Sequence, residues 1–223
     1  MEYMLYHSFV LSLIIQLLVL FVDIYGLNIQ IPKEKLLFNQ LLKMEFGVQI
    51  VEMVFYVWMI YNFSSIKNIT PKRYYDWVIT TPIMLVTLMA YLDSRQYKDI
   101  FEFSSINKNI LMKIVGANLA MLLFGLLGEH QVINYNLAIC LGFIPFIYYF
   151  YLIYQQYFLD AQEKTKDKKM LYWFFFVVWT LYGVAAFLPY VLKNTAYNML
   201  DVFSKNVFGV FLVYIIWTFR VKG

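Results

Sequence analysis

Cysteine, histidine and charged residues are all scarce in this chain of 223 residues. One cysteine excludes a disulfide framework, and two histidines argue against a histidine-rich metal site, so we expect no metal. Charged residues make up 14% of the chain, against roughly 25% in soluble domains, so a soluble fold would lack the polar surface to cover its core. The net charge of +4 comes from scattered residues and does not indicate binding to nucleic acid.

Hydrophobic residues, by contrast, make up 62% of the chain and gather in long runs. A membrane-spanning helix needs about 20 mostly apolar residues. The residues left between such runs are too few for a separate soluble domain. The sequence therefore predicts an all-α bundle of seven transmembrane helices, forming one domain over residues 1–223 of a multi-pass plasma-membrane protein. The predicted spans are 5–25, 36–61, 74–92, 110–127, 132–158, 171–192 and 197–219.

Basic residues are distributed unevenly between the two ends of these spans. Cytoplasmic loops carry an excess of lysine and arginine. Three basic residues, Lys67, Lys72 and Lys193, lie on one side, and eleven lie on the other. We therefore expect the N-terminus outside and the C-terminus in the cytoplasm, with the run from Lys164 to Lys169 in a solvated loop. The eleven are Lys33, Lys35, Arg95, Lys98, Lys108, Lys164, Lys166, Lys168, Lys169, Arg220 and Lys222.

The third and seventh spans contain charged residues, which are costly in a bilayer and usually functional. Arg73, Asp76 and Thr80 are spaced to share one helix face. Asp201 precedes Lys205 by one turn, also on one face. The four charges could form a structural ion cluster that joins the two helices. A buried lysine is a poor structural choice, however, and its amine is suited to forming a Schiff base with an aldehyde.

Both charged segments belong to longer motifs. The third span reads Arg73-Tyr-Tyr-Asp76-Trp77-Val-Ile-Thr80-Thr81-Pro82, and the seventh contains Leu200-Asp201-Val-Phe-Ser204-Lys205. The fourth span adds Gly116-Ala117-Asn118 and Met121-Leu-Leu-Phe-Gly125, and the sixth adds Trp179 and Tyr182. This combination resembles the microbial (type 1) rhodopsin family over all seven spans. In its short loops it is similar to the compact channel-type rhodopsins of giant algal viruses.

The resemblance implies a retinal chromophore. All-trans-retinal would be bound covalently to Lys205 as a protonated Schiff base, with Asp76 and Asp201 as counterions. Asp76 would accept the proton after light-driven isomerisation, Arg73 would lie on the extracellular side, and Thr80 would bond near Asp76. The residues implied to line the retinal are Trp77, Thr81, Met121, Gly125, Trp179, Tyr182 and Phe187.

One position departs from the pattern of efficient outward proton pumps in this family. Seven residues after Thr80, where those pumps usually carry a carboxylic acid as proton donor, this chain has Thr87. A threonine hydroxyl cannot supply a proton at that step. The departure weakens the interpretation as a pump but is compatible with a slow one.

Polar residues form a stripe along the second span. Glu45, Gln49, Glu52 and Tyr56 recur at helical spacing in an otherwise apolar segment. Carboxylates along a path through the membrane favour cations. We therefore interpret the stripe as one wall of an ion pathway, with Glu45 and Glu52 at a constriction on the cytoplasmic side. In the alternative, both glutamates are protonated and take no part in transport.

The first and last spans carry the matching polar residues. Ser12 belongs to a polar stripe on the first span, and Asn198 precedes Asp201 by three residues on the last. We expect these two side chains to help close a central constriction of the same pathway.

These observations together predict a retinal photoreceptor that conducts cations passively in the light and is not an enzyme. An outward proton pump is the first alternative, and a sensory rhodopsin without transport is the second. The expected partners are the lipid bilayer and the transported cations or protons, with no nucleic acid. A homo-oligomer is compatible with the resemblance, because relatives often assemble in that way.

Overall fold

The computed structural model describes residues 2–94, 106–159 and 166–221. In those ranges the chain forms helices and no strands, as predicted. Arg95, Lys98, Lys164 and Lys222, which contribute to the predicted orientation, lie outside the described residues. The first six spans are α1 (Glu2–Leu27), α2 (Leu36–Tyr61), α3 (Thr70–Ser94), α4 (Lys108–Glu129), α5 (Tyr135–Tyr154) and α6 (Lys166–Ala185). The seventh consists of α7 (Tyr190–Asp201), the π-helical turn η4 (Val202–Asn206) and α8 (Val207–Thr218).

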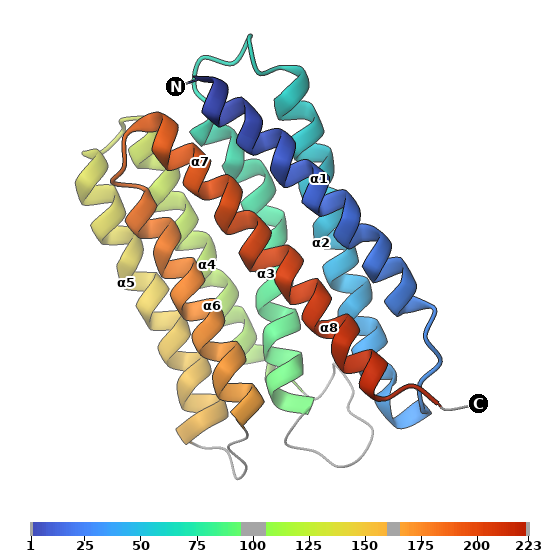
Figure 1. Cartoon of the computed structure of the whole chain (residues 1–223). Coiled ribbons are helices and arrows are strands. Elements are labelled where there is room, and N and C mark those ends of the chain that lie inside the picture. The colour runs from blue at the N-terminus through green and yellow to red at the C-terminus, as the bar shows by residue number, and fades with distance from the viewer. Residues whose placement is uncertain (1, 95–105, 160–165, 222–223) are drawn as a thin grey trace.

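Two further short turns adjoin the spans. The 3₁₀ turn η1 (Lys33–Lys35) leads directly into α2, and the π-helical turn η3 (Gln155–Leu159) extends α5. Both continue a helix and do not form a separate layer, so the bundle keeps seven spans (Figure 1).

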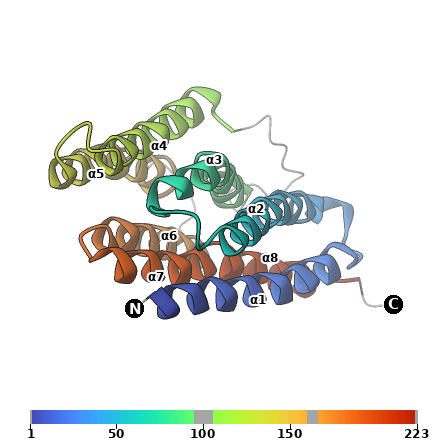
Figure 2. The ribbon, with the colours of Figure 1, turned by 90° about the horizontal axis from the view of Figure 1, so that it is seen from above.

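Helices that follow each other in the chain also pack side by side. α1 contacts α2, α2 contacts α3, α3 contacts α4, and α4 and α5 form the most extensive pair. The seventh span closes the bundle, because α7 contacts α1 and α6 while α8 contacts α1 and α2. Seen from above, α4 and α5 lie on one side, and α1 lies with the seventh span on the other (Figure 2). The seventh span is therefore placed to bring its side chains to α1, α2 and α3.

α1 illustrates how the bundle suits a membrane. Leu11, Leu18 and Phe21 are exposed on its outer face, whereas Ser12 and Asp23 are fully buried. An apolar surface around a polar interior is the arrangement expected of a bundle surrounded by lipid. Six helical segments of the described residues are long and apolar enough to cross a membrane, and α6, whose first turn is charged, completes the seven.

The boundary between the sixth and seventh spans differs from the prediction. α6 ends at Ala185 and not at residue 192, and α7 begins at Tyr190 and not at residue 197. Pro189 directly precedes α7, where its missing N–H costs no hydrogen bond. Lys193 and Asn194, which a hydropathy pattern assigns to a loop, are buried inside the bundle. Because these polar side chains are buried, hydropathy predicted the wrong start for this helix.

The basic run before the sixth span was also assigned wrongly to a solvated loop. α6 begins at Lys166, so Lys166, Lys168 and Lys169 are helical, and Lys168 is fully buried. Lys164 lies outside the described residues.

At Gly26, α1 packs closely against α2 and α8. A methyl group added there would lie 2.6 Å from Val213 Cγ2 and 2.9 Å from Leu42 Cδ2, whereas one added at Gly47 would meet nothing within 4 Å. We expect Gly26→Ala to lower the free energy of unfolding by about 1–3 kcal/mol through overpacking. Gly47→Ala should leave it unchanged or raise it by up to about 1 kcal/mol, because alanine favours helix. Thermal melts followed by far-ultraviolet circular dichroism in detergent compare the two variants, and equal melting temperatures would contradict the packing argument.

Candidate functional site

The π-helical turn η4 carries Lys205 in the middle of the seventh span. Turns of this kind are rare and frequently occur at functional sites. Ser204, Lys205 and Asn206 are all buried in it, and only 2% of Lys205 is exposed. The ammonium group therefore lies in the interior of the bundle, where it requires compensating charge.

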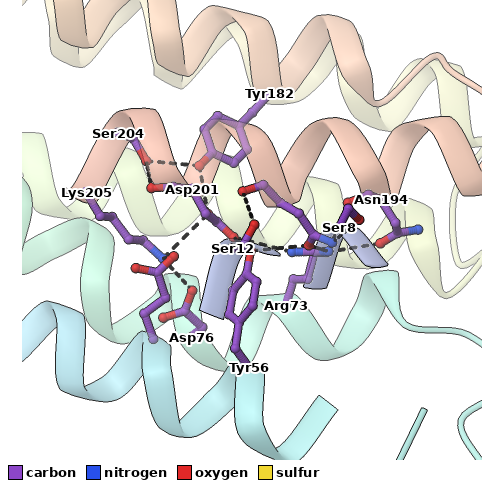
Figure 3. Close-up of polar contacts among 12 residues, drawn as sticks. Ser8, Ser12, Tyr56, Arg73, Asp76, Tyr182, Asn194, Asp201, Ser204 and Lys205 are labelled. Atoms are coloured by element: carbon purple, nitrogen blue, oxygen red, sulfur yellow. Dashed lines mark hydrogen bonds and ion pairs between the residues drawn. The ribbon is translucent and has the colours of Figure 1, made fainter. Parts of the chain in front are cut away.

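Three carboxyl groups from three spans surround the ammonium of Lys205. The Nζ atom lies 2.6 Å from Asp76 Oδ2, 3.5 Å from Asp201 Oδ1 and 3.6 Å from Glu52 Oε1. Figure 3 shows Lys205 and Asp76 pointing toward each other from the seventh and third spans. Glu52, which the sequence analysis expects to form or flank a constriction on the cytoplasmic side, has its side chain beside Lys205.

Asp201 is held by donors on three sides. Tyr56 OH donates to Oδ2 and Tyr182 OH to Oδ1, each at 2.7 Å, and Arg73 Nη1 lies 3.3 Å from Oδ2. Tyr182 reaches this carboxylate from α6 and also lies 3.0 Å from Ser204 Oγ (Figure 3). Three side-chain donors thus converge on this one carboxyl group, and such bonds are strongest when the donor or the acceptor is charged.

Arg73 is fully buried on the side of Asp201 away from Lys205. Its Nε donates to Asn194 Oδ1 at 3.0 Å, one Nη2 bond goes to the Asn194 carbonyl at 3.1 Å, and another goes to Asn198 Oδ1. The guanidinium also lies over the rings of Phe9 and Tyr197, with 5.2 and 5.5 Å to the ring centroids. Charge-assisted bonds and two aromatic faces thus fix this cation in the centre of the bundle.

The predicted threonines of α3 bond within their own helix. Thr80 Oγ1 donates to the backbone carbonyl of Asp76 at 3.0 Å, and Thr81 Oγ1 donates to the backbone carbonyl of Trp77 at 2.7 Å. Asn118 of α4 donates to Thr81 Oγ1 at 2.7 Å and joins the two helices. Each buried hydroxyl is thus satisfied.

A cavity with about 830 Å³ of empty space, including its opening, begins at Lys205 and extends between α3, α4, α5 and α6. The residues that line it include Trp77, Thr81, Met121, Gly125, Trp179 and Tyr182, which the family resemblance implies as lining the retinal. Phe187 does not, because α6 ends at Ala185 and leaves Phe187 in the following turn with 54% of its surface exposed. Several lining residues were missed, including Tyr74, Phe143 and Phe146, because aromatics are too common in this chain to stand out.

The profile of the family described as "Bacteriorhodopsin-like protein" matches residues 4–219, nearly the whole chain. The chain belongs to this family of microbial rhodopsins. It is therefore a multi-pass integral membrane protein, and family membership implies a retinal chromophore.

Solved structures and curated proteins agree with this assignment. The crystal structure of viral rhodopsin OLPVRII is 27% identical, with a TM-score of 0.86, over 97% of this chain and 99% of that one. Halorhodopsin, a light-driven chloride pump, has a TM-score of 0.76 at 15% identity over 96% of each chain, which shows a shared fold. The green-light absorbing proteorhodopsin of Gamma-proteobacterium EBAC31A08 is 25% identical over 69% of this chain. That match spans 62% of the proteorhodopsin's length.

The cavity of this rhodopsin fits such a chromophore. It is lined mostly by apolar and aromatic side chains, and Lys205 is the one described residue with a primary amine in that lining. Gly183 and Gly125 keep it open, because a methyl group at either position would collide with the ring of Phe143 or with Tyr74. The residues present thus suit an apolar aldehyde.

Outside the cavity, the rhodopsin contains a column of buried polar side chains, which we call the polar column. Its members come from α1, α2 and α7 and run alongside Arg73 and Lys205. Asn198 Nδ2 donates to Ser8 Oγ at 2.7 Å, Ser12 Oγ donates to the Asn198 carbonyl at 3.0 Å, and Gln49 Nε2 donates to Asp23 Oδ2 at 2.5 Å. The polar column comprises Ser8, Ser12, Asp23, Glu45, Gln49, Glu52, Tyr56 and Asn198.

Asn194 is the important site residue that the sequence analysis missed. It is fully buried and bonds to Arg73, to Thr70 Oγ1 at 2.9 Å and to the Tyr190 carbonyl at 3.0 Å. A signal was present, because Asn194, Asn198 and Asp201 are spaced to share one helix face. The wrong start of the seventh span concealed it.

Replacing Asn194 tests its role as the support of Arg73. Hydrogen bonds to charged groups contribute about 1.5–3 kcal/mol, so we expect Asn194→Ala to destabilise the protein by about that amount. Thr195 on the next position is a matched control, because its buried hydroxyl has no hydrogen-bond partner in the described part of the chain. Thr195→Ala should have almost no effect. Melting temperatures of the two purified variants provide the measurement, and equal losses would show that Asn194 only packs.

Proposed function

We propose that this rhodopsin is a light-gated cation channel that binds all-trans-retinal covalently through Lys205 Nζ. The observation that carries the proposal is the polar column, which passes Lys205 and contains buried carboxyl groups on both α1 and α2. Carboxyl groups along a path through the membrane attract cations and repel anions. A bundle that only had to be stable would gain from apolar packing at these positions.

Lys205 would hold retinal through Nζ, and the bound group would supply absorption of visible light and a change of shape that displaces this nitrogen and lowers its hold on a proton. Asp76 is placed to take that proton, because its Oδ2 lies 2.6 Å from Nζ and Oδ1 has no hydrogen-bond partner in the described residues. The transfer neutralises both groups. The attraction between α3 and the seventh span is then lost at this point, which loosens the wall of the polar column.

Glu52 gives this centre one carboxyl group more than its cations require. Arg73 and Lys205 balance two carboxylates, and Asp76 and Asp201 are the two that receive hydrogen bonds. Neither oxygen of Glu52 has a hydrogen-bond partner in the described part of the chain. We therefore assign Glu52 as the carboxyl group that is protonated in the dark. It faces the pathway when Asp76 becomes protonated.

Arg73 closes the pathway toward the predicted extracellular side. Its guanidinium fills the space between Phe9 and Tyr197, and Asp201 is its only charged partner among the described residues. Asn194 and Asn198 are neutral, so water can replace them at a modest cost when Arg73 moves. An arginine held mainly by amides is thus suited to act as a gate.

An outward proton pump remains the second candidate. The close contact between Lys205 and Asp76 favours it, because a pump also needs an acceptor next to the nitrogen. Thr87 does not favour it, because its hydroxyl donates to the Ile83 carbonyl at 3.0 Å and cannot supply a proton.

The attachment point is tested by Lys205→Ala in protein supplied with retinal. We expect the visible absorption band to be absent, because no other amine of the described residues borders the cavity. Lys43→Ala, which removes an exposed lysine of α2, should keep the band. A hydroxylamine-sensitive pigment in Lys205→Ala would place the chromophore elsewhere.

Current under voltage clamp separates the channel from the pump. In retinal-loaded cells a channel's photocurrent reverses sign when the voltage crosses the value set by the cation gradient, whereas a pump's current stays outward. We expect reversal, and Glu52→Gln should change the amplitude and the cation selectivity of the current, because Glu52 borders the pathway. Outward current over the whole voltage range would support the pump, and an unaltered current in Glu52→Gln would remove that residue from the pathway.

A further inference from the structure

A second group of buried polar side chains lies in the polar column beyond Lys205, toward α8. Asp23 of α1 is fully buried, and its Oδ2 accepts a hydrogen bond from Gln49 Nε2 at 2.5 Å. The other oxygens of the pair, Asp23 Oδ1 and Gln49 Oε1, have no hydrogen-bond partner in the described part of the chain. The pair thus presents oxygen atoms that nothing in the described structure satisfies.

Gly209 leaves room directly beside this pair. A methyl group at Gly209 would lie 2.6 Å from Gln49 Nε2 and 3.2 Å from each carboxylate oxygen of Asp23. The backbone of α8 therefore approaches the pair without an intervening side chain. Any larger residue would press on the carboxylate and the amide.

Glu45 continues the group one helical turn from Gln49 on α2. Its carboxyl group is fully buried. The Thr87 hydroxyl donates to the Ile83 carbonyl, and neither oxygen of Glu45 has a hydrogen-bond partner in the described residues. No basic side chain of those residues lies within ion-pairing distance of Asp23 or Glu45.

This group has unsatisfied hydrogen-bond acceptors and no unsatisfied donor among its described side chains. Its unsatisfied atoms are all oxygens, from Asp23, Glu45 and Gln49, and the one amide group has already donated to Asp23. Buried acceptors without donors are costly, and a buried carboxylate without a cation is more so. Oxygen-only surroundings are those that hard cations prefer.

We propose that Asp23, Gln49 and Glu45 form a binding site for a partly hydrated monovalent cation, with Na⁺ as its simplest occupant. The inference rests on the proposed channel function and specifies where a cation pauses and is selected. Two carboxyl groups and an amide carry less charge than the carboxylate-rich sites that hold Ca²⁺ firmly. A site on a conduction path must also release its ion, which weak binding allows.

Asp23→Asn tests the site in the full-length, retinal-loaded protein, because it removes the charge and keeps the shape. We expect the Na⁺ to H⁺ permeability ratio, taken from the reversal potential with Na⁺ or N-methyl-D-glucamine outside, to fall about tenfold. Gly209→Ala should lower it as well, by pressing a methyl group on the pair. Glu34→Gln is the matched control, because it removes an exposed carboxylate and should leave the ratio unchanged.

A direct measurement accompanies the currents. Adding NaCl to purified dark protein should shift a carboxylate infrared band in the wild type and not in Asp23→Asn, with N-methyl-D-glucamine chloride as the blank. If Asp23→Asn and Gly209→Ala conduct with unchanged selectivity and the wild type shows no Na⁺-dependent band, the group holds only protons and water, and the site is refuted. An absence of reversing photocurrent in the wild type would instead refute the channel function itself.

Discussion

The ammonium group of Lys205 is the constraint on which the rest of the structure depends. A cation in the middle of an apolar bundle must be compensated locally. The compensating groups come from α2, α3 and α7, so satisfying one amine fixes how three other segments lie around η4. Arg73, Tyr56 and Tyr182 then become necessary in turn, because Asp201 needs donors of its own. The charged centre thus helps to organise the bundle.

The interior of this bundle is divided into two different halves. Between α3, α4, α5 and α6 it is a cavity lined by aromatic rings, which suits an apolar chromophore. Between α1, α2 and the seventh span it is the polar column, in which several carboxyl and amide oxygens have no partner in the described residues. Lys205 lies where the two halves meet. A change of shape in a group bound in the cavity can therefore alter the polar column through the side chain of Lys205.

Much of this arrangement could be predicted because membrane helices make strong local signals. Seven apolar runs predicted seven spans, and the helical spacing of Arg73, Asp76 and Thr80 placed them correctly on a buried face. At the boundary between the sixth and seventh spans, where polarity and burial disagree, prediction from sequence was wrong. Asn194 is polar and buried, so it was left outside the seventh span. Phe187, which the family resemblance implies as lining the retinal, is exposed in the turn after α6.

Glu52 shows most clearly which features of this protein follow from the sequence and which depend on the tertiary structure. The sequence by itself determined that α2 carries a stripe of carboxyl and amide groups and that this stripe must face away from lipid, because the hydrophobic effect and the cost of burying charge act on each helix separately. Only the tertiary structure decided the depth at which each residue meets the neighbouring spans. That depth depends on how far each helix slides along its partners, which is set by side-chain packing between segments distant in the chain. Glu52 therefore meets Lys205, and Gln49 meets Asp23 and Gly209.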